Sequence, residues 1–287
     1  KIWYMDNTGK LHETVLNKGI IKFSLETEKE YLANDVEKDE IFYDVTGITK
    51  SAVSIPVVLE DKKMAISIER MTKNAFKESD LEFLRIFSRL VALSIIKTDL
   101  YLELKRTYFQ TVEALVYAVE LKDPYTRGHS RRVADYSVEI GKKLGFSKEA
   151  LEDLELAALL HDIGKIGVKG AILNKPTKLS AKEFEEVKKH PVLGEQLVGK
   201  VEKLRRIAKI IRHHHERYGG GGYPDGLKGE EIPLEARIIA IVDAYDAMTS
   251  DRPYRKALSK EEALRIIEEN EGLQLSLIHI SEPTRPL

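Results

Sequence analysis

The chain contains no cysteine among its 287 residues. This absence excludes disulfide bonds, cysteine-ligated zinc, iron–sulfur clusters, a thiol nucleophile and any chromophore attached through a thioether. An excess of charge of one sign is also missing, because 46 Lys and Arg residues stand against 47 Asp and Glu residues. The near-neutral balance therefore predicts no non-specific binding to nucleic acid or to a membrane surface.

Long apolar runs are absent as well, since the longest fall far short of the roughly 20 residues that span a bilayer. The sequence accordingly predicts a soluble, cytoplasmic protein with no membrane segment in this fragment. At roughly 100–200 residues per domain, the length favours two domains, each large enough to bury a core.

The first 75 residues alternate polar and apolar side chains in the manner of β-strands. The clearest pair of strands is predicted at residues 51–59 and 64–71, joined by a turn at 60–63. From Ser79, the expected N-cap, the apolar period changes to three or four residues, which predicts a helix. The fold class expected for residues 1–100 is α+β, with an antiparallel sheet and helices.

Neither glycine nor proline interrupts the sequence between Glu78 and Lys122. A continuous helix of about 44 residues would be roughly 65 Å long, which exceeds what one small domain needs. Residues 101–122 are therefore predicted to form a connecting helix between two domains. Two interpretations remain open: a parallel dimeric coiled coil, and an ordinary helix bent onto its own domains.

Beyond Pro124 the pattern is helical throughout, which predicts an all-α domain over residues 123–274. Helices are expected at about 128–145, 148–161, 180–188, 191–199, 202–217, 234–250 and 259–270. Residues 275–287 abandon the helical period, end in two prolines and resemble translated vector sequence. They are treated as a non-native tail.

Histidine is concentrated in the second half of the chain, where six of the eight histidines fall between residues 129 and 215. One of them, in the pair His161-Asp162, completes an apolar helix at 154–160, and Asp243 follows another apolar run. Buried charged groups are rare unless they are paired or bound to a metal. Each such residue alone is a weak signal, but together they predict a metal site with nitrogen and oxygen ligands, suited to iron, manganese, magnesium or zinc.

The order of these motifs resembles the HD-GYP family, the all-α HD-domain metallophosphodiesterases that hydrolyse the bacterial messenger cyclic di-GMP. The resemblance spans about residues 107–272 and rests on His161-Asp162-Ile163-Gly164-Lys165, Lys189-His190-Pro191, His213-His214-His215-Glu216, Gly222-Tyr223-Pro224-Asp225-Gly226, Asp243-Ala244-Tyr245-Asp246 and Arg252-Pro253-Tyr254-Arg255. Position by position, it implies metal ligands at His129, His161, Asp162, His190, His214, His215 and Asp243, with Asp162 bridging. It also implies that Lys165 binds the scissile phosphate and that Tyr223, Arg252 and Arg255 hold the guanine nucleotide and its phosphates.

The resemblance further implies two divalent metal ions, with iron favoured and manganese as the other choice. Family members with three ions carry an acid where this chain has Tyr125, so a binuclear site is predicted. The expected reaction is hydrolysis of cyclic di-GMP to pGpG by a metal-bridging hydroxide, with Asp162 and Lys165 as catalytic residues, and a second cut to GMP is left open. The alternatives are a cyclic-dinucleotide receptor that does not hydrolyse its ligand, and a phosphohydrolase acting on another nucleotide.

The N-terminal part resembles a GAF sensory domain in its strand at 51–57, its hairpin to 64–71 and the segment 76–81 that leads into a helix. This resemblance predicts that the N-terminal domain controls the catalytic domain through the connecting helix of a homodimer. The alternative is a GAF unit whose role is only structural or dimerising.

Overall fold

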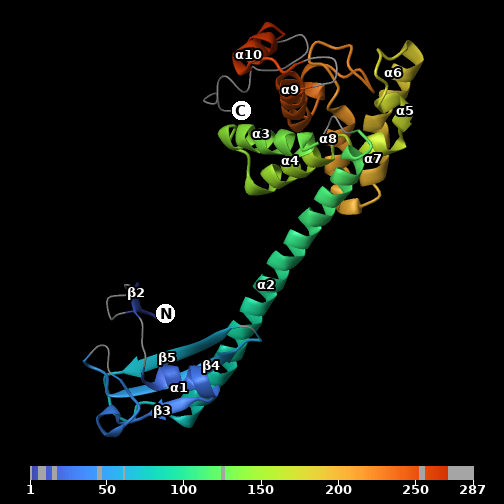
Figure 1. The fold of residues 1–287 in the computed structure, drawn as a ribbon. Helices are drawn as coiled ribbons and strands as arrows, with labels where there is room; N and C mark the ends of the chain where they lie inside the picture. The colour runs from blue at the N-terminus through green and yellow to red at the C-terminus, as the bar shows by residue number, and fades with distance from the viewer. Residues whose placement is uncertain are drawn as a thin grey trace. The chain divides into compact units, whose positions relative to one another are not determined.

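The computed structural model describes residues 2–5, 11–14, 18–43, 47–60, 62–123, 127–251 and 256–270. The chain divides into two compact units, Lys1–Arg106 and Thr107–Leu287. Helix α2 (Glu78–Glu120) begins in the first unit and ends in the second (Figure 1). Among the described residues, no helix combines the length and the apolar character that a membrane crossing requires.

The N-terminal unit contains a three-stranded antiparallel sheet. Its strands are β3 (Tyr31–Ala33), β4 (Ser51–Val58) and β5 (Lys63–Arg70), with the largely buried β4 in the centre. The hairpin register runs from Ser51 opposite Arg70 to Val58 opposite Lys63, so the two predicted strands are confirmed to within one residue. Strands β1 (Ile2–Met5) and β2 (Leu11–Thr14) form a separate antiparallel pair.

The expectation of strand alternation throughout residues 1–75 is wrong at helix α1 (Ile20–Thr27) and at the short 3₁₀ helix η1 (Val36–Lys38). The buried residues of α1 are Ile20 and Ser24, four positions apart, and the Ser24 hydroxyl donates to the Ser54 carbonyl of β4 at 3.3 Å. Short apolar runs fit both periods, and here the packing against the sheet selects the helix.

Helix α2 has 43 residues and confirms the predicted long helix, although it starts at Glu78 rather than after Ser79. The carboxylate of Asp80 accepts the backbone N–H of Lys77 at 2.8 Å, which satisfies a donor at the helix start. Near that end, Leu81 and Leu84 pack with Val53, Ile55 and Phe76 in the core of the N-terminal unit. Near the other end, α2 contributes to the core of the second unit through Val112, Val116 and Val119.

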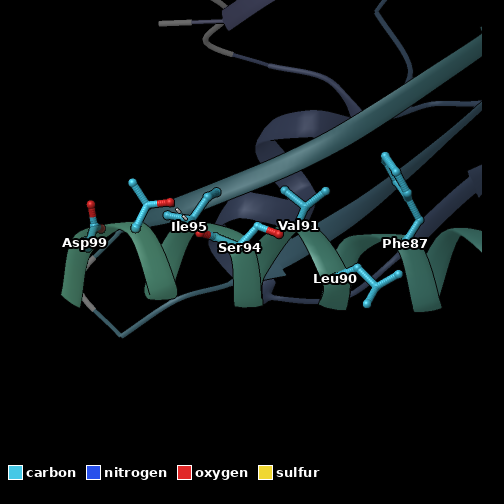
Figure 2. A pocket seen from close by; sticks show the side chains of 7 residues that line it. Phe87, Leu90, Val91, Ser94, Ile95 and Asp99 are labelled. Atoms are coloured by element: carbon cyan, nitrogen blue, oxygen red, sulfur yellow. Dashed lines mark hydrogen bonds between the residues drawn. The ribbon is translucent and has the colours of Figure 1, made fainter. Parts of the chain in front are cut away.

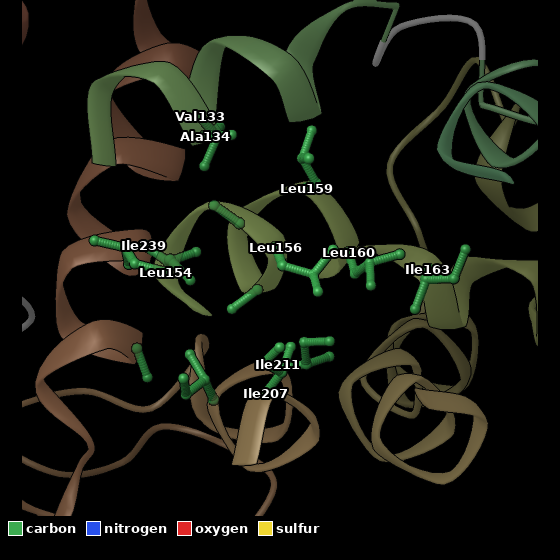
Figure 3. Packing of buried hydrophobic residues seen from close by; sticks show 14 of the residues in the cluster. Val133, Ala134, Leu154, Leu156, Leu159, Leu160, Ile163, Ile207, Ile211 and Ile239 are labelled. Atoms are coloured by element: carbon green, nitrogen blue, oxygen red, sulfur yellow. The ribbon is translucent and has the colours of Figure 1, made fainter. Parts of the chain in front are cut away.

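The described part of the second unit is helical. Its elements are α3 (His129–Lys143), α4 (Lys148–Leu160), η3 (Ile163–Gly167), α5 (Gly170–Leu173), α6 (Ala181–Val187), α7 (His190–Val198), η4 (Glu202–Leu204), α8 (Arg205–His213), η5 (Gly229–Glu231), α9 (Leu234–Thr249) and α10 (Lys260–Glu269). Helix α4 packs against both α3 and α8, and its residues 156–160 are all buried (Figure 3). The run Leu156–Leu160 is apolar on every side of the helix, which requires this enclosed position.

The predicted helix at 202–217 is too long, because α8 ends at His213 after the 3₁₀ turn η4. His214 and His215 therefore follow the helix instead of extending it, which frees the two rings to turn the same way. Tyr125, Arg252, Arg255 and the tail 275–287 lie outside the described residues.

Candidate metal centre

The seven side chains predicted as metal ligands come from five segments of the second unit. His129 and His190 are the first residues of α3 and α7, and His161-Asp162 directly follows α4. The other three are His214 and His215, just after α8, and Asp243 within α9. The structure brings all seven together, and five of them are buried: His129, His161, Asp162, His190 and His214.

Their donor atoms form three overlapping groups in which all atoms lie within 4.8 Å of one another. The groups are His129, His161 and Asp243; His161, Asp162 and His214; and His190, His214 and His215. The two oxygens of Asp162 face different imidazoles, with Oδ1 3.3 Å from His190 Nε2 and Oδ2 3.5 Å from His161 Nε2. A carboxylate in this position is able to bridge two cations.

Hydrogen bonds to the outer ring nitrogens fix which nitrogen faces the centre. Nδ1 of His161, His190 and His214 lies 2.6–2.7 Å from the carbonyl oxygen three residues earlier. A carbonyl can only accept a hydrogen bond, so each Nδ1 carries the proton and each Nε2 presents its lone pair. This arrangement is typical of metal-bound histidine, where the second ring nitrogen donates to an oxygen.

The inward lone pairs provide a test of whether these residues fit a metal ion. His161 Nε2 is buried and has no hydrogen-bond partner, and His190 Nε2 lies only 3.3 Å from His214 Nε2. Two facing lone pairs repel each other, and an unpartnered buried acceptor is costly. A divalent cation among these nitrogens and the carboxylates of Asp162 and Asp243 would satisfy all of them, so the residues fit such an ion.

His129 is oriented by a carboxylate that the sequence analysis did not assign. Asp246 Oδ2 lies 2.7 Å from His129 Nδ1, and the buried Asp246 also receives hydrogen bonds from Arg132 at 2.6 and 2.9 Å. On its other side, His129 Nε2 lies 3.2 Å from Asp243 Oδ1. A signal for Asp246 was present, because residues three apart share one face of a helix and Asp243 and Asp246 both belong to α9.

Lys165 lies beside the predicted bridging carboxylate. Its Nζ is 2.7 Å from Asp162 Oδ2 and 3.2 Å from Asp123 Oδ2. A glycine permits the close approach of η3 and α7, since a Cβ on Gly164 would lie 1.9 Å from the carbonyl oxygen of His190. Asp123 is a second carboxylate that sequence reasoning missed.

The pKa values of the imidazoles differ from one another in direction. Burial lowers the pKa of His215 to about 4, and it lowers the pKa values of His190 and His214 as well, so all three are neutral near pH 7 and free to bind a metal. Burial also acts to lower the pKa of His129, but hydrogen bonds to Asp243 and Asp246 outweigh it and raise that pKa to about 9.

The carboxylates remain ionised despite their burial. Burial raises the pKa of Asp162, but the positive charge of the adjacent Lys165 ammonium lowers it well below its ordinary value. Burial acts to raise the pKa of Asp243 as well, but the hydrogen bond from His129 and the charge of that imidazole outweigh burial and lower it. The centre therefore presents negative charge to a cation.

The loop after α8 places Tyr223 beside the centre, with its ring centroid 4.9 Å from that of His215. The Tyr223 backbone N–H donates to the His215 carbonyl at 3.2 Å. Gly222 is needed for the packing of the loop on itself, because a Cβ there would lie 2.4 Å from the Arg217 nitrogen. His213 turns away from the centre, with Nε2 3.0 Å from Asp225 Oδ2.

Proteins similar in sequence to this chain include relatives named as phosphodiesterases of cyclic dinucleotides. A "3'3'-cGAMP-specific phosphodiesterase 3" of Vibrio cholerae serotype O1 is 40% identical over 211 residues, covering 73% of this chain and 45% of that protein. A "Cyclic di-GMP phosphodiesterase" of Thermotoga maritima is 35% identical over 242 residues, covering 80% of this chain and 65% of that protein. The chain thus spans about half to two thirds of the length of these relatives.

A solved structure of a cyclic GMP-AMP-specific phosphodiesterase from V. cholerae is 37% identical and covers 61% of this chain and 41% of that chain. Its TM-score of 0.37 is too low to support a structural argument. Residues 113–275 match the family model of the HD domain. This match covers more than half of the sequence and includes all seven side chains of the centre, so the chain belongs to the HD domain family.

Proposed function

We propose that this chain is a metal-dependent phosphodiesterase of the HD-GYP type that hydrolyses cyclic di-GMP to linear pGpG. The observation that carries the proposal is the convergence of five imidazoles and two carboxylates, with Nδ1 of three buried histidines held by backbone carbonyls and Nε2 turned inward. Relatives at 35–40% identity are named cyclic di-GMP phosphodiesterases, which supports the same activity.

Two divalent ions would be held by the seven residues. His129, His161 and Asp243 would bind one ion, His190, His214 and His215 the other, and Asp162 would lie between them. Nitrogen and oxygen ligands without sulfur suit iron, manganese, magnesium or zinc, and the resemblance to the HD-GYP family favours iron, with manganese as the next choice. When bound, the ions would supply Lewis acidity and an activated water at neutral pH.

The chain's own groups would bind and orient the substrate. The Lys165 ammonium, which lies beside Asp162, would bind a non-bridging oxygen of the scissile phosphodiester and offset charge that accumulates there. Tyr223 would contact the guanine nucleotide next to His215. Arg252 and Arg255 are assigned to the phosphates by the motif alone.

A second candidate substrate is the mixed dinucleotide 3'3'-cGAMP. One observation favours it, namely that the V. cholerae relative at 40% identity is named as specific for 3'3'-cGAMP. A receptor that binds without hydrolysis is less well supported, because every predicted metal ligand is retained. Side-by-side turnover of cyclic di-GMP and 3'3'-cGAMP at equal concentrations separates the two substrates.

The decisive experiment is elemental analysis of anaerobically purified protein together with a hydrolysis assay on the same sample. Wild type is expected to contain about two metal ions per chain and to release pGpG. Asp162→Ala should lose both metal and turnover, whereas His213→Gln should keep both, because His213 points away from the centre. Full activity of Asp162→Ala without metal would refute the proposal.

Control by the N-terminal unit through a homodimer belongs to the same proposal. On α2, residues 83, 86, 90, 93, 97, 100 and 104 repeat at the alternating three- and four-residue spacing of a coiled coil. Six of the seven are apolar, and each of these is more than half exposed in the single chain: Phe83, Ile86, Leu90, Leu93, Leu100 and Leu104. These six side chains form the seam of α2. If each buries on the order of 100 Å² in a dimer, the seam and its flanking residues approach the roughly 800 Å² that each partner buries in a standard interface.

An open pocket next to this seam is lined by Phe87, Leu90, Val91, Ser94, Ile95, Thr98 and Asp99 (Figure 2). A second copy paired in parallel along α2 would cover both the seam and the side of this pocket nearest Leu90. In such a dimer, a change in the N-terminal unit would reach the second unit as a rotation or shift of the helix. The GAF resemblance gives this unit a sensory role in the proposal.

A further inference from the structure

The last turn of α2 holds the residues on either side of His129. Glu120, which is only 8% exposed, accepts the backbone N–H of Gly128 through Oε2 at 2.9 Å and the N–H of Ser130 through Oε1 at 3.3 Å. Gly128 offers no side-chain cap to α3. The Glu120 carboxylate therefore takes the place of the N-cap and fixes the backbone from which the His129 ring projects.

Residues just beyond the end of α2 bond to the segment that carries Lys165. Asp123 Oδ2 lies 3.2 Å from Lys165 Nζ, and the same ammonium lies 2.7 Å from Asp162 Oδ2. Next to Asp123, the Lys122 ammonium donates to the Ile166 carbonyl of η3 at 2.7 Å. Asp123 belongs to none of the three groups of candidate ligand atoms, so it holds Lys165 from outside the centre.

We propose that Glu120 and Asp123 are positioning residues that set the metal affinity of this centre. Glu120 fixes the direction of the His129 ring. The Lys165 ammonium and a metal ion compete for the Asp162 carboxylate, and Asp123 weakens this competition by attracting the ammonium to itself. The inference rests on the proposed metal centre but not on the identity of the nucleotide. Outer partners of metal ligands typically change metal affinity by about 10–100-fold when they are removed.

The same contacts tie the centre to α2. A displacement of this helix by about 1 Å would lengthen the 2.9 Å contact of Glu120 with Gly128 beyond hydrogen-bond range. Because α2 is one uninterrupted helix from Glu78, a rotation or shift that starts in the N-terminal unit would be carried along it to Glu120 and to Asp123 just beyond its end. The metal affinity of the centre then becomes the quantity that α2 controls.

Cobalt titration of the metal-free full chain, followed by visible absorption, tests this inference. In Glu120→Gln, the side-chain amide N–H would face one of the two backbone N–H groups that the carboxylate accepts, those of Gly128 and Ser130. Asp123→Asn removes the negative charge that attracts the Lys165 ammonium. We expect both variants to bind cobalt at least about tenfold more weakly than wild type. The absorption spectrum should change shape in Glu120→Gln, because one imidazole is reoriented.

Glu113→Gln is the matched control. Glu113 lies on the same helix and pairs with Arg131 of α3 at 3.2 Å, but both side chains are about half exposed, and the other partners of Arg131 among the described residues are Asp135 and Glu155, neither of which is a candidate ligand. It should bind cobalt like wild type. Thermal unfolding of the metal-free variants identifies a purely structural role, which would lower the melting temperature and leave cobalt affinity unchanged.

Wild-type cobalt affinity in both Glu120→Gln and Asp123→Asn would overturn the inference. If Glu120→Gln fails to fold, Asp123→Asn alone decides, since it is isosteric and lies beyond the helix end. The titration contains no nucleotide, so a wild type that binds cobalt but hydrolyses no cyclic dinucleotide would refute the proposed function and leave this inference standing.

Discussion

Gly164→Ala is expected to disable the metal centre without altering any ligand. The added Cβ would lie 1.9 Å from the His190 carbonyl oxygen and 2.6 Å from the Gly194 nitrogen, and real Cβ atoms essentially never approach closer than 3.0 Å. Because both contacts are to backbone of α7, no side-chain rotation can relieve them. Helices η3 and α7 must therefore separate by about 1 Å.

The separation acts directly on two candidate ligands. Asp162 directly precedes η3 and His190 begins α7, and Asp162 Oδ1 lies 3.3 Å from His190 Nε2. Metal–ligand distances tolerate changes of only about 0.2 Å, so a 1 Å displacement should weaken metal binding by at least about tenfold. Overpacking of this kind costs about 2–3 kcal/mol, which corresponds to roughly 4–12 °C in melting temperature for a unit of this size.

Calorimetric titration with manganese and thermal unfolding measure the two effects. Gly167→Ala is the control, because it lies in the same 3₁₀ helix and its Cβ would meet only the flexible end of Leu193, at 2.7 Å. That variant should keep metal affinity and most of the stability. If Gly164→Ala bound manganese as tightly as wild type, the argument that backbone contact between η3 and α7 positions the ligands would be refuted.

Three further outcomes are expected. Asp246→Asn should weaken metal binding about tenfold or more, measured by titration, because His129 and Arg132 lose their charged partner. In the folded protein the pKa of Asp246 is lowered from 3.8 to about 2, so its charge contributes roughly 2 kcal/mol to the free energy of unfolding. This contribution is present above about pH 4 and is lost as the pH falls towards 2. Without metal, the wild type should therefore be more stable than Asp246→Asn above about pH 4, and the difference should disappear towards pH 2. Chelation of a site saturated at 100 times its Kd should remove about 2.7 kcal/mol and lower the melting temperature by roughly 5–11 °C, with no such shift in Asp162→Ala. Leu93→Glu combined with Leu100→Glu should give monomers in light scattering, whereas Leu102→Glu, an equally exposed apolar position on the outer face of α2, should leave the dimer intact; a monomeric wild type would contradict the seam.

Much of the architecture could be predicted from local sequence. The C-terminal part of α4 is apolar and α2 contains no glycine or proline, and helical periodicity located both helices to within about two residues. Prediction failed where two periods compete, as at Ile20–Thr27, and where a helix stops for the sake of its neighbours, as at His213. Local propensity is weaker than tertiary packing at such positions.

The sequence by itself determined which residues are candidates for the centre, because histidines and aspartates at the ends of apolar helices are costly to bury unless they are paired or bind a metal. Only the tertiary structure decided which nitrogen of each histidine faces inward, that Asp246 orients His129 from 117 positions away, and that Glu120 and Asp123 hold the segments around the centre. The physical reason is that a hydrogen bond requires its donor and acceptor to be positioned to within a few tenths of an ångström. For side chains remote in sequence, tertiary packing sets that position.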